Sequence, residues 1–263
     1  MKTLVVNADD FGFTRDVNEG IVEAHRSGIL TATTLMATGA AFDHAVELAR
    51  DTPTLDIGCH LVLVGSPGFP GTVAQLVREL AFRRVPICKE LTAQVRRILA
   101  AGIVPTHLDT HKHTHLIPAV LEAVARISEE FRIPWVRRPF DFPLQAGGVP
   151  LATRLASAAF GLVRGRFTRV LGLHGCRTTD SFAGFRITGR YDAAELARLI
   201  RQLPEGTTEF MCHPGYCSDE LRASRTRLKE SRRQELDALV SGEVKAALQS
   251  AGVTLANYRQ LSR

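Results

Sequence analysis

The sequence predicts a single-domain α/β fold, a distorted (β/α) barrel, over residues 1–263. Apolar runs alternate with helical patterns from end to end, which is typical of parallel strands joined by crossover helices. The length of 263 residues suits one barrel of this kind. A doubly wound open sheet is the alternative, because it has the same rhythm. Strands are expected near residues 3–8, 31–37, 55–63, 105–110, 133–138, 176–181, 207–213 and 252–256.

Helices are expected between these strands, and glycine or proline marks several of their ends. Pro118 precedes one helix, and Gly28 and Gly102 follow two others, as is common at helix starts and stops. Two stretches interrupt the rhythm, residues 66–86 and 139–175, and both are interpreted as rim or lid insertions. The first contains a helical pattern at 73–82 and the second an apolar one at 151–163. The remaining helices are expected at 17–27, 43–50, 89–101, 119–130, 192–202 and 223–240, the last continuing through 249.

Composition is that of an ordinary globular protein, with 45% apolar and 23% charged residues. The net charge of +6 comes largely from arginine-rich stretches at 137–138, 164–169 and 222–233, interpreted as solvated helix faces. Attraction to an anionic membrane surface stays open, whereas nucleic-acid binding has no supporting motif. Five cysteines without a C-x-x-C motif indicate a reducing compartment. With neither a signal peptide nor a membrane-spanning apolar run, we expect a cytoplasmic protein, with membrane-peripheral contact left open.

Two adjacent carboxylates, Asp9 and Asp10, end the first expected strand. Gly12 breaks that strand, and Asp16 and Glu19 resemble a capping box at the following helix. Two acids at one strand end repel each other unless a cation or a shared proton relieves the repulsion. The pair therefore indicates a metal site, with an Asp cap and turn as the simpler alternative.

Histidines supply matching ligands for such a metal. His60 closes one apolar run, and the segment 106–115 contains four histidines and Asp109. Alternation in an extended chain would point His107, Asp109, His111, His113 and His115 to one side. Two imidazoles and one carboxylate are a usual ligand set for zinc, iron(II) or manganese, and they leave positions open for substrate.

A further histidine, His213, ends another expected strand and is followed by Pro214-Gly215. Its distance in sequence from the histidine cluster suits a general acid, with a turn histidine as the equal alternative. The Asp pair, His60, His111 and His213 all fall at the carboxyl ends of expected strands, the face that carries the active site in β/α barrels. Together they predict metal-assisted hydrolysis.

Four ordered motifs resemble the YdjC-like carbohydrate deacetylases, a group that includes the chitooligosaccharide deacetylases. They are Asn7-Ala8-Asp9-Asp10-Phe11-Gly12, Gly58-x-His60-Leu61, His107-Leu108-Asp109-Thr110-His111-x-His113 and His213-Pro214-Gly215. The resemblance implies a distorted barrel of the glycoside hydrolase/deacetylase type. It also implies Asp10, His60 and His111 as metal ligands, Asp9 as the catalytic base and His213 as the catalytic acid. The family's metal is commonly given as Mg²⁺, while the ligand chemistry equally suits Zn²⁺.

Two short loops are most similar to the hopanoid-biosynthesis branch of that family, His60-Leu61-Val62-Leu63-Val64-Gly65 and the segment 180–189. This similarity implies an N-acetylglucosaminyl hopanoid glycolipid as substrate, beside a chitooligosaccharide. Asp180 and Arg138 are candidates for orienting substrate or the base, as are Asp109 and His113, with a surface ion pair or turn as the alternative for the first two. A non-catalytic metal- or sugar-binding regulatory protein, and less favoured a glycosidase, remain as other functions, and the oligomeric state stays open.

Overall fold

The computed structural model describes residues 1–82, 84–143 and 148–262. Its centre is an eight-stranded parallel sheet whose strands follow the spatial order β5-β4-β3-β2-β1-β7-β6, with β8 paired to β1. The predicted single α/β domain of distorted-barrel type is confirmed, as a curled half-barrel. The strands are β1 (Lys2–Phe11), β2 (Ala32–Leu35), β3 (Asp56–Leu61), β4 (His107–Thr110), β5 (Trp135–Val136), β6 (Ser181–Ala183), β7 (Gly206–Cys212) and β8 (Val253–Leu255).

The sheet curls without completing a ladder between β5 and β6. Among the described residues, that side carries isolated bridges from Trp135 to Arg177 and from Asp141 to Phe182. On the other side, β8 pairs with the first residues of β1, and β2 pairs with its last residues. Because β1 lies between β2 and β7 in the interior of the strand order, its carboxyl end is flanked by those of neighbouring strands.

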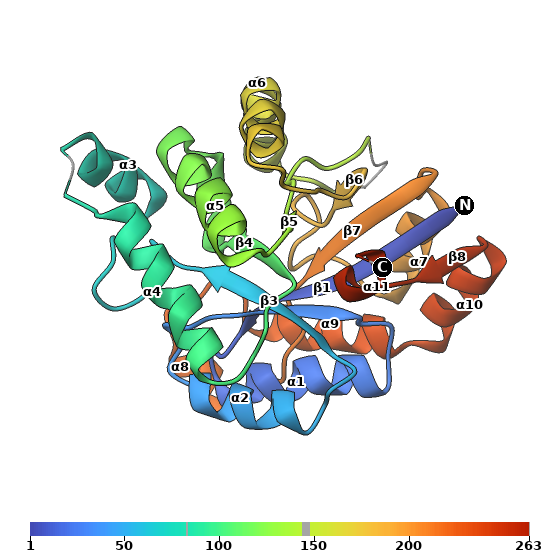
Figure 1. Cartoon of the computed structure of the whole chain (residues 1–263). Helices are drawn as coiled ribbons and strands as arrows, with labels where there is room; N and C mark the ends of the chain where they lie inside the picture. Colours follow the sequence, from blue (N-terminus) through green and yellow to red (C-terminus); the bar gives the residue numbers. More distant parts are fainter. Residues whose placement is uncertain (83, 144–147, 263) are drawn as a thin grey trace.

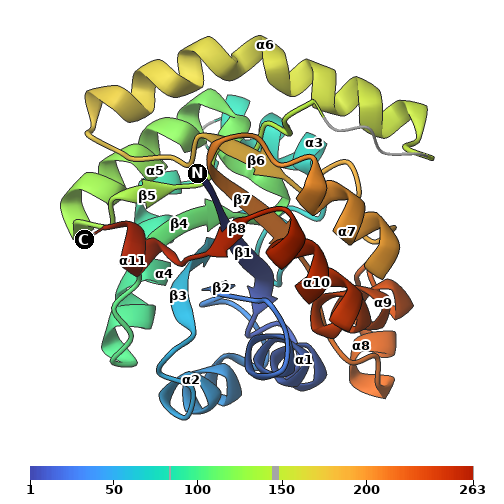
Figure 2. The same cartoon turned by 90° about the vertical axis from the view of Figure 1, so that its right-hand side faces the viewer.

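Helices surround the sheet, as the view along it shows (Figure 2). α6, the longest of them, lies across the outer edge of the molecule above α5 and β6 (Figure 1). Residues 83 and 144–147, within the two predicted insertions, lie outside the described residues. The helices are α1 (Arg15–Arg26), α2 (Phe42–Arg50), α3 (Val73–Ala81), α4 (Ile87–Ala100), the 3₁₀ segment η1 (His111–Leu116), α5 (Pro118–Phe131), α6 (Leu151–Leu173), α7 (Ala193–Arg201), α8 (Asp219–Ala223), α9 (Glu230–Val240), α10 (Gly242–Ser250) and α11 (Tyr258–Leu261).

Four local expectations were wrong in detail. The strand expected at 176–181 lies at 181–183, and the helix expected at 151–163 extends to residue 173. The helix expected at 223–240 is divided, because residues 225–228 leave it to line a pocket. Asp16 does not cap α1: Thr14 is the N-cap residue, and the carboxylate of Asp16 accepts hydrogen bonds from the backbone and hydroxyl of Ser218.

Candidate metal centre

A bulge at the end of β1 turns both Asp9 and Asp10 toward the same cavity. On a regular strand, adjacent side chains point to opposite faces. Here the β1–β2 register shifts between Ala8 and Phe11, and Asp10 adopts a left-handed backbone with φ of 70°. Such a conformation costs energy in a residue other than glycine and is concentrated at functional sites. The bulge therefore allows two consecutive carboxylates to line one pocket.

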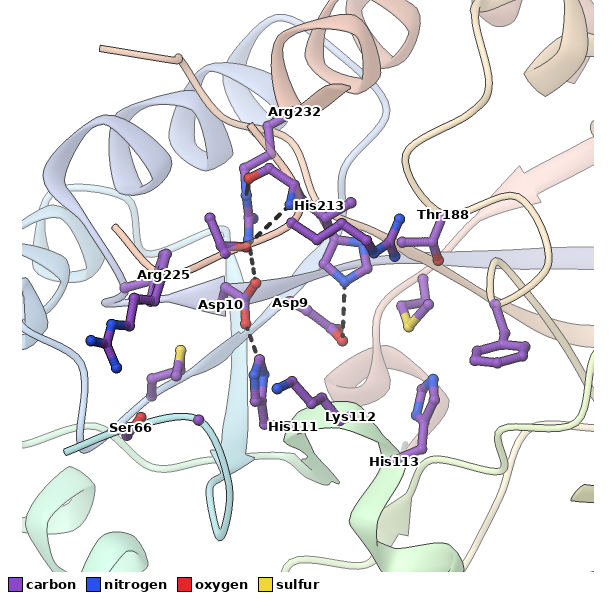
Figure 3. Close-up of a pocket in the computed structure, with 18 residues that line it drawn as sticks. Asp9, Asp10, Ser66, His111, Lys112, His113, Thr188, His213, Arg225 and Arg232 are labelled. Atoms are coloured by element: carbon purple, nitrogen blue, oxygen red, sulfur yellow. Dashed lines mark hydrogen bonds and ion pairs between the residues drawn. The ribbon is translucent and has the colours of Figure 1, made fainter. Parts of the chain in front are cut away.

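Three side chains from separate strand ends converge beside this bulge. The Oδ1 atom of Asp10 lies 3.4 Å from Nε2 of His60 and 3.3 Å from Nδ1 of His111. The two imidazole nitrogens lie 3.2 Å apart. Donors about 2.1 Å from one ion, at angles of about 90–109°, are separated by about 3.0–3.4 Å. The three atoms thus fit a single divalent ion, and Figure 3 shows Asp10 directed at His111.

The two oxygens of Asp10 have different surroundings. Oδ1 is buried and has no hydrogen-bond partner among the described residues. Oδ2 accepts a hydrogen bond of 2.5 Å from Nη2 of Arg232, whose side chain is 1% exposed. Burial by itself would raise the pKa of Asp10, but Arg232 and the two histidines hold it well below its usual range. Asp10 is therefore an ionised candidate ligand with one oxygen that could bind a cation.

His60 is oriented from behind by a carboxylate. Its Nδ1 atom donates to Oδ1 of Asp109 at 2.7 Å, which leaves Nε2 directed at Asp10 and His111. Metal-binding histidines usually donate their other ring nitrogen in this way. Burial would lower the pKa of His60, but Asp109 and Asp10 outweigh it and raise the pKa to about 10. A metal ion binding at Nε2 must therefore displace a proton.

Asp9 belongs to a second charged group, which surrounds Arg137. The guanidinium donates to both oxygens of Asp9 at 2.7 and 2.8 Å, and it also contacts Asp109 at 2.6 Å and Glu209 at 2.7 Å. Burial raises the pKa of Asp9, yet Arg137 reverses the shift and holds the carboxyl ionised. Asp9, His60 and Asp109 also lie close enough to form a metal-binding group. Since Arg137 already supplies the positive charge there, Asp10, His60 and His111 are the better site.

His213 lies beside Asp9 in the same pocket, and its ring points toward the carboxylate of Asp9 (Figure 3). Its Nε2 atom is 3.8 Å from Oδ2 of Asp9, and its Nδ1 atom is buried without a partner among the described residues. The backbone amide of His213 donates to Glu235, which also accepts from the hydroxyl of Tyr191. Burial lowers the pKa of His213 more than Asp9 and Glu235 raise it, so the free protein holds this imidazole neutral at pH 7.

The pocket between these groups has a volume of about 450 Å³, within the range of small-molecule sites. Asp9, Asp10, His111 and His213 line it. Further lining residues come from other parts of the chain, among them Gly65, Ser66, Lys112, Phe185, Thr188 and the segment 225–228. The combination of a cation site, an ionised carboxylate and a neutral imidazole suits hydrolysis of a polar substrate.

Comparison with known proteins identifies the family. The model for YdjC-like proteins matches residues 3–250. The chain belongs to the YdjC-like family.

Two full-length relatives carry a functional name. A carbohydrate deacetylase of Brevibacillus brevis is 34% identical, with 98% of this chain and 99% of the relative covered. A carbohydrate deacetylase of Geobacillus stearothermophilus is 33% identical, over 97% of this chain and 96% of the relative. A solved structure from Enterococcus faecalis, whose description proposes cellobiose-phosphate cleavage, is 27% identical with a TM-score of 0.75, covering 99% of this chain and 98% of that one.

In this YdjC-like chain the five side chains of segment 107–115 do not share one side. The chain leaves the strand after Thr110, and Lys112 and His113 adopt left-handed conformations with φ of 54° and 51°. His107, at the amino end of β4, donates from Nε2 to Oδ1 of Asn7 and stacks on Tyr258. His115 bonds Thr110 and the backbone oxygen of Arg137. His113 does line the pocket, packed against Phe160 and Phe185.

Asp180 and Arg138 do not line this pocket. Asp180 accepts a hydrogen bond from the backbone amide of Thr207. Thr207 pairs with Thr3 near the amino end of the sheet, at the opposite end of β7 from His213. Arg138 is half-buried near Arg164, and both burial and that neighbour lower its pKa. The structure thus gives Asp180 the role of the turn residue that was its alternative.

Arg137, Glu209 and Arg232 were missed by sequence reasoning. Arg137 and Arg232 had been interpreted as parts of solvated helix faces, but both are buried. Two adjacent arginines at the end of a strand could have indicated that one of them is buried, because neighbouring side chains on a strand point to opposite faces. Glu209 could likewise have indicated a buried basic partner, because it lies in the buried strand β7 and an unpaired charge there is costly. Arg232 lies in a highly charged segment and has no comparable signal.

Proposed function

We propose that this protein is a metal-dependent hydrolase that removes the N-acetyl group from an N-acetylglucosamine-type sugar. The observation that carries the proposal is the convergence of Asp10, His60 and His111 on one cation position, 3.2–3.4 Å apart, beside Asp9 and His213. The names of the two full-length relatives support the same reaction class. An N-acetylglucosaminyl hopanoid and a chitooligosaccharide are the two substrates to which the loop similarities and the family point.

A divalent ion at this centre would stabilise negative charge on the acetyl carbonyl oxygen. Two imidazole nitrogens beside one carboxylate favour Zn²⁺ or a similar transition-metal ion, whereas Mg²⁺ prefers oxygen ligands. The ligand atoms of this chain therefore make Zn²⁺ a stronger candidate than the family resemblance alone indicates.

Asp9 and His213 divide the proton transfers in this proposal. Asp9, which Arg137 keeps ionised and fixed in orientation, accepts a proton from the attacking water. His213 is neutral in the free protein and lies 3.8 Å from Asp9. It acquires that proton during the reaction and delivers it to the leaving amine nitrogen as the C–N bond breaks. The proton comes from the attacking water, so one amide and one water give acetate and the protonated amine.

Acetate release tests the function directly. Purified protein is incubated with chitobiose, free N-acetylglucosamine and an N-acetylglucosaminyl glycolipid, before and after chelation and after addition of Zn²⁺ or Mg²⁺. We expect release that chelation abolishes and one of the ions restores. Turnover that survives complete removal of metal would refute the metal-dependent mechanism. Binding of the sugars without acetate release would indicate the non-catalytic alternative.

A further inference from the structure

The outward side of α6 carries an exposed stripe of leucines, which we call the α6 outer face. Leu151, Leu155, Leu162 and Leu173 follow one another at intervals of 4, 7 and 11 residues, spacings that return to the same side of a helix. These side chains expose 61–88% of their surface. Arg166 and Arg169, 4 and 7 residues after Leu162, are exposed on the same side.

The opposite side of α6 fixes which residues face outward. Phe167 and Leu171 are buried, and the ring of Phe167 lies 5.2 Å from that of Phe140. Phe160 packs 4.7 Å from Phe185, which lines the pocket. The helix, which lies along the edge of the molecule (Figure 2), is thus anchored by one side. Its leucine stripe is exposed on the other.

The charge around this stripe has a single sign. No Asp or Glu occurs between Asp141 and Asp180, while α6 contains four arginines, the other two being Arg154 and Arg164. The nearest acids of α5 are already paired, Glu122 with Arg126 and Glu129 with His174. Exposed leucines interspersed with arginines, without acids, are typical of helices that lie in a membrane interface.

We propose that the α6 outer face docks on the surface of an anionic lipid membrane. The leucines enter the boundary between headgroups and acyl chains, and Arg166 and Arg169 contact lipid phosphates. A second copy of this chain fits the face less well, because its α6 would add Arg166 and Arg169 again without an acid to offset them. Among the described residues, no helix is both long and apolar enough to span a bilayer, so the contact is peripheral.

Docking of this face has a consequence for the pocket. Phe160, on the inner side of α6, contacts Phe185 at the pocket wall. A membrane held against α6 therefore lies one helix diameter, about 10 Å, from the pocket wall. The docking proposal itself does not depend on the deacetylase proposal, since the face and the metal centre share no residue.

Co-sedimentation with vesicles tests the docking. The full-length protein is mixed with vesicles of phosphatidylglycerol and phosphatidylcholine, or of phosphatidylcholine alone, at physiological ionic strength. The test variants are Leu162→Asp and the double variant Arg166→Gln/Arg169→Gln. The matched controls are Val104→Asp, at another exposed apolar residue, and Arg190→Gln/Arg201→Gln, at two exposed arginines outside α6.

We expect binding to the anionic vesicles alone. The double arginine variant should weaken it about 25-fold, since each basic residue near such a surface contributes about fivefold, and Leu162→Asp should abolish it. Both controls should bind as the wild type does. Failure of the wild type to sediment with anionic vesicles, or equal losses in test and control variants, would overturn the proposal. So would sedimentation-velocity data in which Leu162→Asp converts a dimer to a monomer. Unchanged acetate release from a soluble sugar would show that the metal centre is intact in each variant.

Discussion

The guanidinium of Arg232 lies 2.5 Å from the carboxylate of Asp10, although 222 residues separate them in sequence. Arg232 belongs to α9, and Asp10 to the bulge of β1. The contact occupies one oxygen of Asp10 and leaves the other facing His60 and His111. A residue near the end of the chain therefore determines how the central carboxylate is presented.

Replacing Arg232 by Met should destabilise the metal-free protein by about 3–5 kcal/mol, because a buried carboxylate loses its partner. Saturating Zn²⁺ should recover part of this loss, since the ion binds the folded state and supplies positive charge to Asp10. Denaturant unfolding with and without Zn²⁺ measures both effects. The neighbouring Arg233→Met is the matched control: its exposed pair with Asp237 should contribute less than about 1 kcal/mol. Equal losses in the two variants would contradict the role given to Arg232.

Replacing Asp109 by Asn should weaken metal binding without removing a ligand. The amide keeps the size of the side chain but no longer presents a carboxylate to Nδ1 of His60, 2.7 Å away. Loss of such partners typically costs about 10–100-fold in metal affinity. Competition with a fluorescent chelator measures this. Asp180→Asn, the same change outside the pocket, should leave the affinity unchanged, and an unaltered affinity in Asp109→Asn would argue against the orienting role.

The two adjacent aspartates should separate metal binding from turnover. Asp9→Asn should retain metal and lose about 10²–10⁴-fold in kcat, because its carboxylate is the proposed proton acceptor. Asp10→Asn should lose both metal and turnover. Metal content by mass spectrometry and kcat on one soluble substrate check this together. Full activity in Asp9→Asn would remove that residue from the role of base.

The stability of the protein should vary with pH through Asp141. Its carboxylate accepts the backbone amides of Phe185 and Arg186, yet burial outweighs these bonds and raises its pKa from 3.8 to about 6. The folded state therefore favours the protonated form. The stabilising contribution is complete below about pH 4 and is lost as the pH rises through 6.

Asp141→Asn should remove this dependence. Between about pH 4 and pH 7, the free energy of unfolding of the wild type should fall by roughly 3 kcal/mol relative to that of the variant. Denaturant unfolding of both proteins across this range provides the comparison. A difference that stays constant with pH would show that the carboxyl group is not protonated in the fold at acidic pH.

The fold type could be predicted, and so could the placement of the Asp pair, His60, His111 and His213 at one edge, because parallel strands bring their carboxyl ends together. The choice of Asp10, His60 and His111 among them came from the family resemblance. What periodicity could not show was where the chain departs from regular geometry. After β4, the left-handed Lys112 and His113 send His115 away from the metal centre, and neither residue is a glycine that would have marked the turn.

The burial of charged side chains was the other feature that could not be predicted from the sequence. Arg137 and Arg232 resemble the exposed arginines around them, and their burial depends on carboxylates that the fold brings from distant strands. The break between α8 and α9 was not predicted either, because its charged residues are compatible with a helix, but they line the pocket instead. The sequence pattern predicted, for most strands, which residues lie at their ends. It did not predict which side chains of the charged segments point into the fold.

The central claim is that one divalent ion is held by Asp10, His60 and His111. Anomalous diffraction from crystals grown with Zn²⁺ or Mn²⁺ tests it most directly. The account predicts one peak about 2.0–2.3 Å from Oδ1 of Asp10, Nε2 of His60 and Nδ1 of His111. An ion bound elsewhere in the pocket, or no peak in crystals of protein that still releases acetate, would contradict it.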